Sequence, residues 1–507
     1  MNLIVTAVLT LTVTTLSGQY RTDAVPATGV KSDTSAVVIT LDDALKIALS
    51  ENVAVKVADK EIERNQYAKK GTYSSLFPQV AGSGSYQRTI KKQIMYMDSD
   101  SGDDEEGGGG FGMLSSLAPY FIRINELSAI QGMPLIIPGE SESSSSNSGF
   151  AVGRWNTYNY GVNAQMPLIN AQLWESLRIS GQAVDLAVEK ARSSRLDMVT
   201  QVKQAFYAVL LAKEAFNVYK DVYENAVENF VQTERRYNSE KASELEYTRA
   251  KSVVAGAIPN VYNAESSVML ALWQLKAVMG VDLDRNIDVA GSLGDYSTQM
   301  FRDIHDNDDP SLDYNTTLRQ LELQADQLAS SVRMYKAAYL PTLSAAFAYN
   351  MIAMTNDFKF SEYKWSPYSY VGLSLNIPIF TGFKRHYDVK QAKVQAVELD
   401  LQRIETERQL RIAIRQFLNT METSMNSYHA ATEAVGLARK AYDIAAKSYK
   451  VGKGTITDMN DAQLTLTQAS LQQSQAVYNF IVAKSSLEQI LGGDFIDEDG
   501  IVDLDNM

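Results

Sequence analysis

Two hydrophobic periods alternate along the chain. Four short segments alternate apolar and uncharged polar residues with a period of two, which predicts half-buried β-strands. These segments lie at about 79–90, 153–167, 341–352 and 366–378. Two longer segments, 171–280 and 384–492, carry apolar residues at helical spacing around one polar turn each, which predicts long helical hairpins. The first helix of each hairpin runs for about 65 residues, or roughly 100 Å. The predicted fold is therefore mainly α with a small β part.

The predicted strands are two-faced. Val371, Leu373 and Leu375 share one face of the last strand, and Tyr160 and Val162 share one face of the second. The opposite faces are polar but uncharged. Such alternation fits any half-buried antiparallel sheet, and in an exported chain it also suits a membrane barrel with these five side chains toward outer-membrane lipid. Four strands cannot close a barrel and an open edge cannot lie in lipid, so a membrane location requires an oligomer, and three copies would supply twelve strands.

The whole pattern occurs twice, which indicates a duplicated chain. The first copy spans 39–290, the second spans 311–494, and an acidic linker at 291–310 joins them. Matching landmarks recur at an offset of 211 or 212 residues: Pro167 and Pro378, Tyr237 and Tyr449, and Gly280 and Gly492.

Other segments lie outside the duplicated plan. Residues 1–19 are apolar and end in small residues, which predicts a signal peptide, followed by an N-terminal linker at 20–38. The insertion at 91–150 has no counterpart in the second copy and contains the low-complexity stretches "DSDSGDDEEGGGGFG" and "GESESSSSNSG". On a barrel, it belongs in a long external loop. Residues 495–507 are a C-terminal tail.

The composition narrows the function. A formal net charge of −13 argues against nucleic acid as a partner, because phosphate binding needs clustered Lys and Arg. With no cysteine and three histidines far apart, the chain has no disulfide or thiolate metal site, and we predict neither a metal nor a cofactor. It carries no nucleophile elbow and no phosphate loop, so an enzyme is not expected.

The polar turns of the two hairpins carry the candidate functional residues. They lie in "RRYNSEKASELEYTRA" and "KSYKVGKGTITDMNDAQ". Ser243 with Glu246, and Thr455 with Asp458, have the spacing of capping boxes, which satisfy free amides at a helix start. Capping does not account for Asp461, one turn further on the same helix face as Asp458.

These motifs resemble the TolC-like outer-membrane efflux family. The resemblance rests on the opening "ITLDDALKIALSEN", on the strand-to-helix passages "MPLIN" and "IPIFTG", and on the two turns, and it covers about residues 39–494. It implies a homotrimer in which twelve strands form an outer-membrane barrel, continued across the periplasm by a tunnel of twelve helices. The family provides exit ducts for efflux pumps and type I secretion, working with a periplasmic adaptor protein and an inner-membrane transporter.

The resemblance also assigns roles at the turns, which in this family are the tips at the periplasmic entrance. It implies that Asp458 and Asp461 ring the narrowest point, and that Tyr449 and Glu246 help to hold the closed state. Gly454 stands where a family member carries a latch arginine, so that link is missing here, and Arg249 is a candidate substitute through a neighbouring carboxylate.

One alternative remains at this stage. A periplasmic coiled-coil adaptor or scaffold would share the long helical hairpins, but it would carry a β-rich domain beside one hairpin rather than two symmetric strand pairs. The sequence does not name the transported substrate or the class of transporter.

Overall fold

The computed structural model describes residues 37–95, 150–297 and 311–493, which divide into a helical unit and a sheet unit. The sheet unit takes Tyr73–Ala171 and Leu340–Ile379, and the helical unit takes the rest. The predicted signal peptide, most of the insertion and the C-terminal tail lie outside the described residues. Within these ranges, none of the helices combines the length and the apolar content needed to cross a bilayer.

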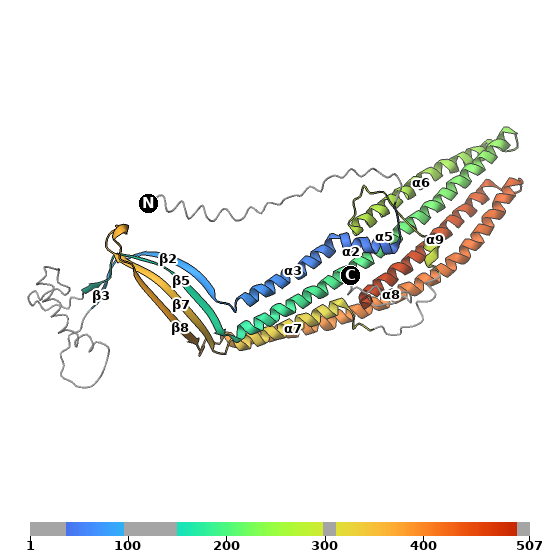
Figure 1. Cartoon of the computed structure of the whole chain (residues 1–507). Coiled ribbons are helices and arrows are strands. Elements are labelled where there is room, and N and C mark those ends of the chain that lie inside the picture. Colours follow the sequence, from blue (N-terminus) through green and yellow to red (C-terminus); the bar gives the residue numbers. More distant parts are fainter. Residues whose placement is uncertain (1–36, 96–149, 298–310, 494–507) are drawn as a thin grey trace, which may run out of the picture. The chain divides into compact units, whose positions relative to one another are not determined.

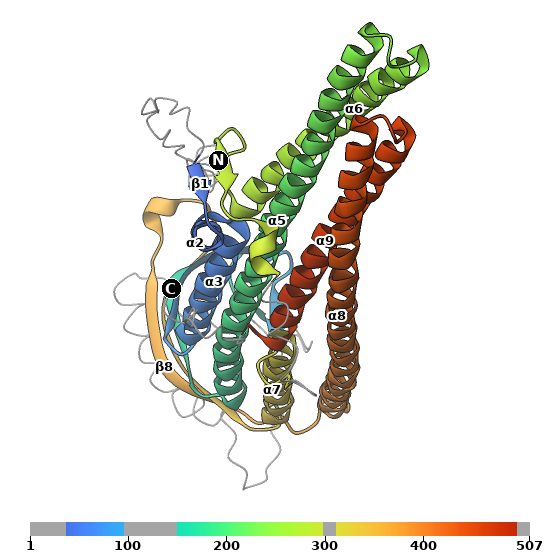
Figure 2. The ribbon, with the colours of Figure 1, turned by 90° about the vertical axis from the view of Figure 1, so that its right-hand side faces the viewer.

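The helical unit contains two long hairpins, whose tips lie at one end of the unit (Figures 1 and 2). The hairpins are α5 (Ala171–Asn238) with α6 (Glu244–Met279), and α8 (Lys384–Lys450) with α9 (Ile456–Leu491). Three shorter helices accompany them: α2 (Leu41–Glu51), α3 (Val53–Ser74) and α7 (Thr316–Ala337). Strand β1 (Val37–Ile39) pairs in parallel with β6 (Ile287–Val289), and the short 3-10 helix η1 (Leu293–Tyr296) follows.

The helical hairpins repeat one another closely. Helices α5 and α8 have 68 and 67 residues, and α6 and α9 have 36 each. Both hairpins end in a left-handed glycine, Gly280 at φ +72° and Gly492 at φ +93°, a backbone conformation that favours glycine at a helix C-terminus. A Cβ atom would also meet backbone in the preceding segment, at Asn52 for Gly280 and at Tyr314 for Gly492.

Two asparagines anchor the base of the hairpins in the same way. Asn52 lies between α2 and α3, and its amide donates to the carbonyl of Val278 at 2.6 Å. Asn315 caps the start of α7, and its amide donates to the carbonyl of Ile490 at the same distance. Each asparagine therefore joins the start of a short helix to the last turn of a long hairpin.

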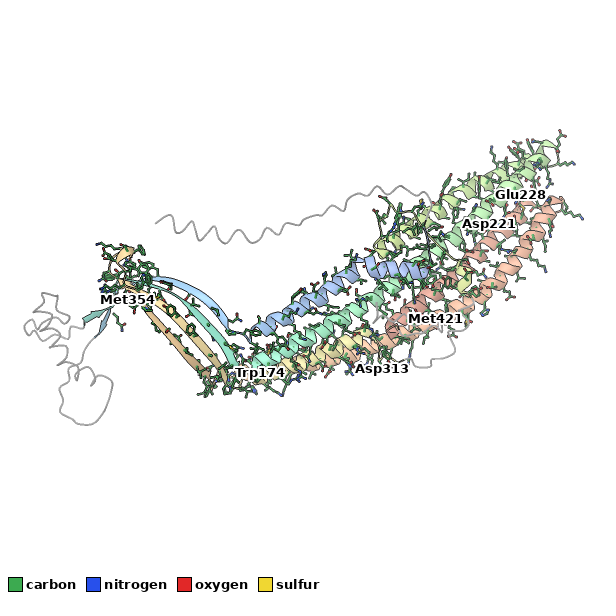
Figure 3. All side chains as sticks on the ribbon, viewed as in Figure 1. Trp174, Asp221, Glu228, Asp313, Met354 and Met421 are labelled. Carbon is green, nitrogen blue, oxygen red and sulfur yellow. The ribbon has the colours of Figure 1, made fainter. Side chains whose placement is uncertain are left out.

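The core of the helical unit lies around the middle of the hairpins. Its largest fully buried side chains include Phe206 and Leu210 of α5, Leu275 of α6 and Phe480 of α9. Met421 of α8, labelled in Figure 3, belongs to the same cluster. On α8, buried residues are seven positions apart at Ala392 and Leu399, at Ile414 and Met421, and at Ala431 and Ala438, the spacing of a coiled-coil seam.

The sheet unit is built on four antiparallel strands in the order β2-β5-β7-β8. They are β2 (Gln79–Arg88), β5 (Asn156–Ile169), β7 (Thr342–Thr355) and β8 (Ser366–Asn376). The outer strands β2 and β8 each pair on one side only among the described residues. The register places Val162 opposite Tyr349, and Phe347 opposite Val371.

One face of this sheet is apolar and exposed. We call it the apolar face, and its exposed members include Val80, Tyr160, Val162, Phe347, Tyr349, Val371, Leu373 and Leu375. All five side chains predicted to face lipid are among them. The opposite face includes polar cross-strand contacts, such as the hydrogen bond of 3.1 Å that Asn163 donates to the Ser83 hydroxyl.

Several segments differ from the prediction. The segment "LDDALKIALSENVAVKVADKEIERNQYAKK", whose pattern predicts one helix at the start of the first copy, forms two helices that meet at Asn52, because the Asn52 side chain bonds to Ala54 and Val278. Part of the insertion predicted as loop at 91–150 is strand, since β3 (Gln93–Met95) pairs with β4 (Phe150–Val152). The segment predicted as an acidic linker at 291–310 contains the 3-10 helix η1 near its start, because the Leu293 side chain is buried in the helical core. The linker predicted at 20–38 gives way to β1 at Val37.

Candidate functional site: the tips of the helical hairpins

A small apolar cluster holds the two hairpin tips together. Its fully buried members are Ala250 of α6, Tyr449 of α8, and Ile456 and Met459 of α9. Phe230 of α5 packs against them. Since all four long helices contribute, burial of this cluster fixes one tip against the other.

Tyr449 is the centre of the contact between the tips. Its side chain is 2% exposed, and its hydroxyl lies 2.6 Å from that of Thr233 on α5. The Thr233 hydroxyl donates to the carbonyl of Asn229, so the Tyr449 hydroxyl is the donor of the pair. A buried phenol needs such a partner, because an unpaired hydroxyl in an apolar cluster is destabilising.

Arg236 contacts Tyr449 from the last turn of α5. Its guanidinium donates to the carbonyl of Tyr449 at 3.1 Å and lies 5.1 Å from the centre of the Tyr449 ring. The accepting carbonyl belongs to the C-terminal end of α8, where a cation is favourable to the helix dipole. Arg236 therefore stabilises the end of one hairpin helix from the other hairpin.

The tyrosines that match in sequence have different surroundings. Tyr237, the counterpart of Tyr449, is 38% exposed and stacks on Tyr247 at 5.0 Å between ring centres. Of the two matching tyrosines, Tyr449 is therefore buried between the hairpins and Tyr237 is not. The two copies of the turn thus make different contacts.

The predicted capping boxes are confirmed at both tips. At the start of α9, the Asp458 carboxylate accepts from the backbone amide of Thr455 at 3.1 Å and from its hydroxyl at 2.7 Å. The Asp458 amide donates back to the Thr455 hydroxyl. These hydrogen bonds, that of the hydroxyl first, hold the pKa of Asp458 below its ordinary value. Ser243 and Glu246 form the equivalent box at the start of α6.

The two aspartates lie on an exposed face of α9. Ile456 and Met459 point into the cluster between the tips, and Asp458 and Asp461 each follow one of them by two residues, about 200° around the helix. Both aspartates are exposed, and the Asp461 side chain has no hydrogen-bond or ion-pair partner among the described residues. The structure thus places two carboxylates on the side of α9 that turns away from the other tip.

The remaining predicted residues make weaker contacts. Arg249 is exposed and donates to the hydroxyl of Thr457 at 3.4 Å, while Glu246 is occupied by its capping box. At Gly454, a Cβ atom would lie 3.0 Å from the Ser448 side chain and 3.2 Å from the Tyr449 amide, so the tight turn disfavours a larger residue there.

The family model described as "Outer membrane efflux protein" matches residues 139–281 and 310–493, more than half of the chain. The chain belongs to the outer membrane efflux protein family. The predicted family and the localisation to the outer membrane are thereby confirmed, and the adaptor alternative loses its support.

Relatives and solved structures are consistent with this family. The chain is 20% identical to the outer membrane protein TolC of Vibrio cholerae over 66% of its own length and 76% of that protein. The chain is 21% identical to the outer membrane protein TolC of Escherichia coli, over 63% of its own length and 66% of that protein. The structure of the Campylobacter jejuni outer membrane channel CmeC superposes with a TM-score of 0.64 at 18% identity, covering 91% of this chain and 87% of that one. The open-state structure of the Neisseria gonorrhoeae outer membrane channel MtrE superposes with a TM-score of 0.61 at 16% identity, covering 89% of this chain and 88% of that one. At these identities the structural likeness supports the fold of this outer membrane efflux protein.

Sequence reasoning missed Thr233 and Arg236. Arg236 lies inside the quoted motif "RRYNSEKASELEYTRA", but its partner Tyr449 is 213 residues away. The available signal was a basic residue in the last turn of a helix, which indicates a contact with helix carbonyls without saying to which helix they belong.

We expect Arg236→Met to loosen the contact between the tips of this efflux protein. The substitution keeps the apolar stem but removes a charge-assisted hydrogen bond and a cation–π contact, so backbone amides around 445–459 should exchange about fivefold faster, for roughly 1 kcal/mol. Hydrogen-exchange mass spectrometry measures this. Arg235→Met is the matched control, since Arg235 is exposed in the same turn. Equal acceleration in both variants would contradict a specific role for Arg236.

We also expect acid to weaken the start of α9. Because folding lowers the pKa of Asp458, its contribution to stability is complete above the unfolded pKa of about 4 and is lost as the pH falls through the lower folded value. Amide exchange in the first turn of α9, corrected for intrinsic rates, should therefore accelerate below about pH 4. Asp458→Asn should remove this dependence, whereas Asp461→Asn keeps the capping bonds and should retain it. An unchanged acid response in Asp458→Asn would rule out the capping carboxylate as its source.

Proposed function

We propose that three copies of this outer membrane efflux protein form an exit duct, in which the strands make the barrel and the hairpin tips form the periplasmic entrance. The duct passes small molecules or polypeptides delivered through a periplasmic adaptor by an inner-membrane transporter, in a tripartite efflux or type I secretion system. The observation that carries the proposal is the four-stranded sheet, which has an exposed apolar face and whose outer edges have no partner among the described residues.

The geometry of the sheet supports closure by further copies. Strands β2 and β8 run antiparallel to each other, because three antiparallel pairings separate them. The β8 edge of one copy can therefore pair with the β2 edge of the next and continue an all-antiparallel sheet. Lipid offers no partner for edge amides and carbonyls, so only a closed ring satisfies them. Three copies give twelve strands, an even number typical of such barrels.

The side chains of the sheet support the same arrangement. In the apolar face, Val371, Leu373 and Leu375 are 81%, 70% and 60% exposed. Such a face on a water-exposed sheet would be an aggregation site, whereas in a bilayer it matches the hydrocarbon. The polar face would line an aqueous interior.

The exposed aspartates of α9 support an entrance that favours cations. Threefold symmetry about the tips would bring three copies of Asp458 and of Asp461 around one axis. Carboxylates at 4 Å repel each other by about 1 kcal/mol per pair in bulk water, and more in a narrow pore. Such a ring attracts cations and excludes anions, and a multivalent cation can bridge it. The Tyr449 contacts with Thr233 and Arg236 then act within each copy to keep the tips together.

We expect opposite responses to charge on the two faces of β8. Leu373→Arg should lower the yield of assembled trimer, because an arginine at the lipid-facing midplane costs about 2–4 kcal/mol. Ser374→Arg is the matched control, since its side chain points to the polar face and should be tolerated. Heat-modifiable migration of trimer extracted from outer membranes measures both. If the two variants lose trimer equally, the apolar face does not contact lipid.

The duct itself is tested by single-channel recording in planar bilayers. The wild type should conduct weakly, favour cations and be blocked by a trivalent cation added from the side of the tips. Asp458→Asn combined with Asp461→Asn should abolish the block and weaken cation preference while the trimer remains stable. Unchanged block and selectivity would contradict an aspartate ring, and an absence of any channel from intact trimer would contradict the duct.

A further inference from the structure

All charged side chains among the described residues of the sheet unit lie at one end of its four strands. The body of the sheet has none, whereas its loop end carries six cations and two carboxylates. The cations are Arg88, Lys91, Lys92, Arg154, Lys359 and Lys364. The carboxylates are Asp357 and Glu362, and none of the cations forms an ion pair with a carboxylate that the structure describes. Counted over the described residues, this end of the sheet is therefore basic, in a protein whose formal net charge is −13.

The pairing register brings these cations to a common edge. Arg88 is the last residue of β2 and pairs with Asn156, which pairs with Thr355 at the end of β7. Met354, labelled in Figure 3, marks this end of the sheet. The Arg88 guanidinium lies 5.9 Å from the Phe358 ring centre, and the Lys92 ammonium lies 4.8 Å from that of Trp155. Aromatic rings therefore support the charged groups.

The loop between β7 and β8 continues the apolar face to this edge. Phe360 and Tyr363 pack on Tyr158 at 5.5 Å and 5.2 Å between ring centres, and Trp365 packs on Tyr160 at 4.8 Å. Lys359 and Lys364 flank these rings in sequence and are exposed. The apolar surface that could hold an acyl chain is thus directly next to cations that could bind a phosphate.

We propose that this end of the sheet binds the phosphate headgroup of an anionic lipid, with Arg88, Lys359 and Lys364 as the main contacts and the acyl chains along the apolar face. The proposal rests on the proposed function, since it requires the sheet to lie in a membrane. Charge complementarity favours an anionic headgroup over a zwitterionic one, because each basic residue near an anionic lipid surface strengthens binding about fivefold. The opposite end of the strands, where β2 begins at Gln79 and β8 ends at Asn376, carries no cation among the described residues of the sheet unit. The preference for an anionic headgroup therefore applies to one side of the bilayer only.

The test is native mass spectrometry of the full chain in an uncharged detergent at low salt. Phosphatidylglycerol and phosphatidylcholine with identical acyl chains are titrated separately, and glycerol phosphate is a third, chain-free arm. The wild type should bind phosphatidylglycerol most tightly and glycerol phosphate least. The triple variant Arg88→Gln, Lys359→Gln and Lys364→Gln should lose up to about 100-fold of the affinity for phosphatidylglycerol and little of that for phosphatidylcholine.

A control triple removes three exposed lysines of α8 instead: Lys390→Gln, Lys393→Gln and Lys440→Gln. It should bind phosphatidylglycerol as the wild type does. Equal affinity of the wild type for both lipids, equal loss in both triples, or glycerol phosphate binding as tight as lipid would each overturn the proposal. If lipid preference emerges only after deletion of residues 98–148, the acidic insertion rather than a lipid occupies the cations, which also overturns it.

Insertion into vesicles separates this inference from the duct. A chain that inserts into phosphatidylcholine vesicles and forms channels there, but shows no preference for phosphatidylglycerol, would refute the lipid site alone. A chain that inserts into neither kind of vesicle would refute the duct on which the site depends.

Discussion

Within the part of the chain that the structure describes, the four-stranded sheet leaves both outer edges without a partner, and this is the strongest constraint on the fold. An edge strand exposes a row of amides and carbonyls, which water can satisfy and hydrocarbon cannot. The apolar face makes water an unfavourable solvent for the same strands. A single copy of such a sheet fits neither environment well, and the closed ring of the proposed trimer would resolve the conflict.

Local contacts fix the long hairpins at both ends. Left-handed glycines and the anchoring asparagines Asn52 and Asn315 fix their bases, while capping boxes and the Tyr449 cluster fix their tips. Between these points the seam on α8 relies on small and medium side chains at seven-residue steps, which allow close helix packing. At the tips, a small apolar cluster and a few hydrogen bonds join the two hairpins, so a few side chains decide the arrangement there. The duplicated turn became asymmetric there, since Tyr449 is buried and Tyr237 is not.

Features that depend on neighbours in sequence were predictable, and features that depend on distant partners were not. Strand parity needs only alternate positions, so the shared face of Val162 and Leu373 could be derived from the sequence. The capping box of Thr455 and Asp458 needs only three residues. By contrast, the helix break at Asn52 depends on a carbonyl 226 residues away, and the role of Arg236 depends on Tyr449 in the other copy. The 3-10 helix at Leu293 could not be predicted from composition, because its neighbours are acidic. Its position is set instead by the burial of the single apolar side chain of Leu293 in the helical core.

The pairing of β5 with β7 sets the order in which the chain can assemble. Each helical hairpin closes through a turn of a few residues, so its contacts are local and can form early. The central strand pair joins residues far apart in sequence, such as Asn156 of β5 and Thr355 of β7, and its loop-closure entropy is repaid only after the first hairpin is complete. In the proposed trimer, the two outer edges of the sheet pair with other copies and close last. In that assembly the apolar face would lack its final surroundings until a concentration-dependent step, and the delay would expose the chain to misassembly.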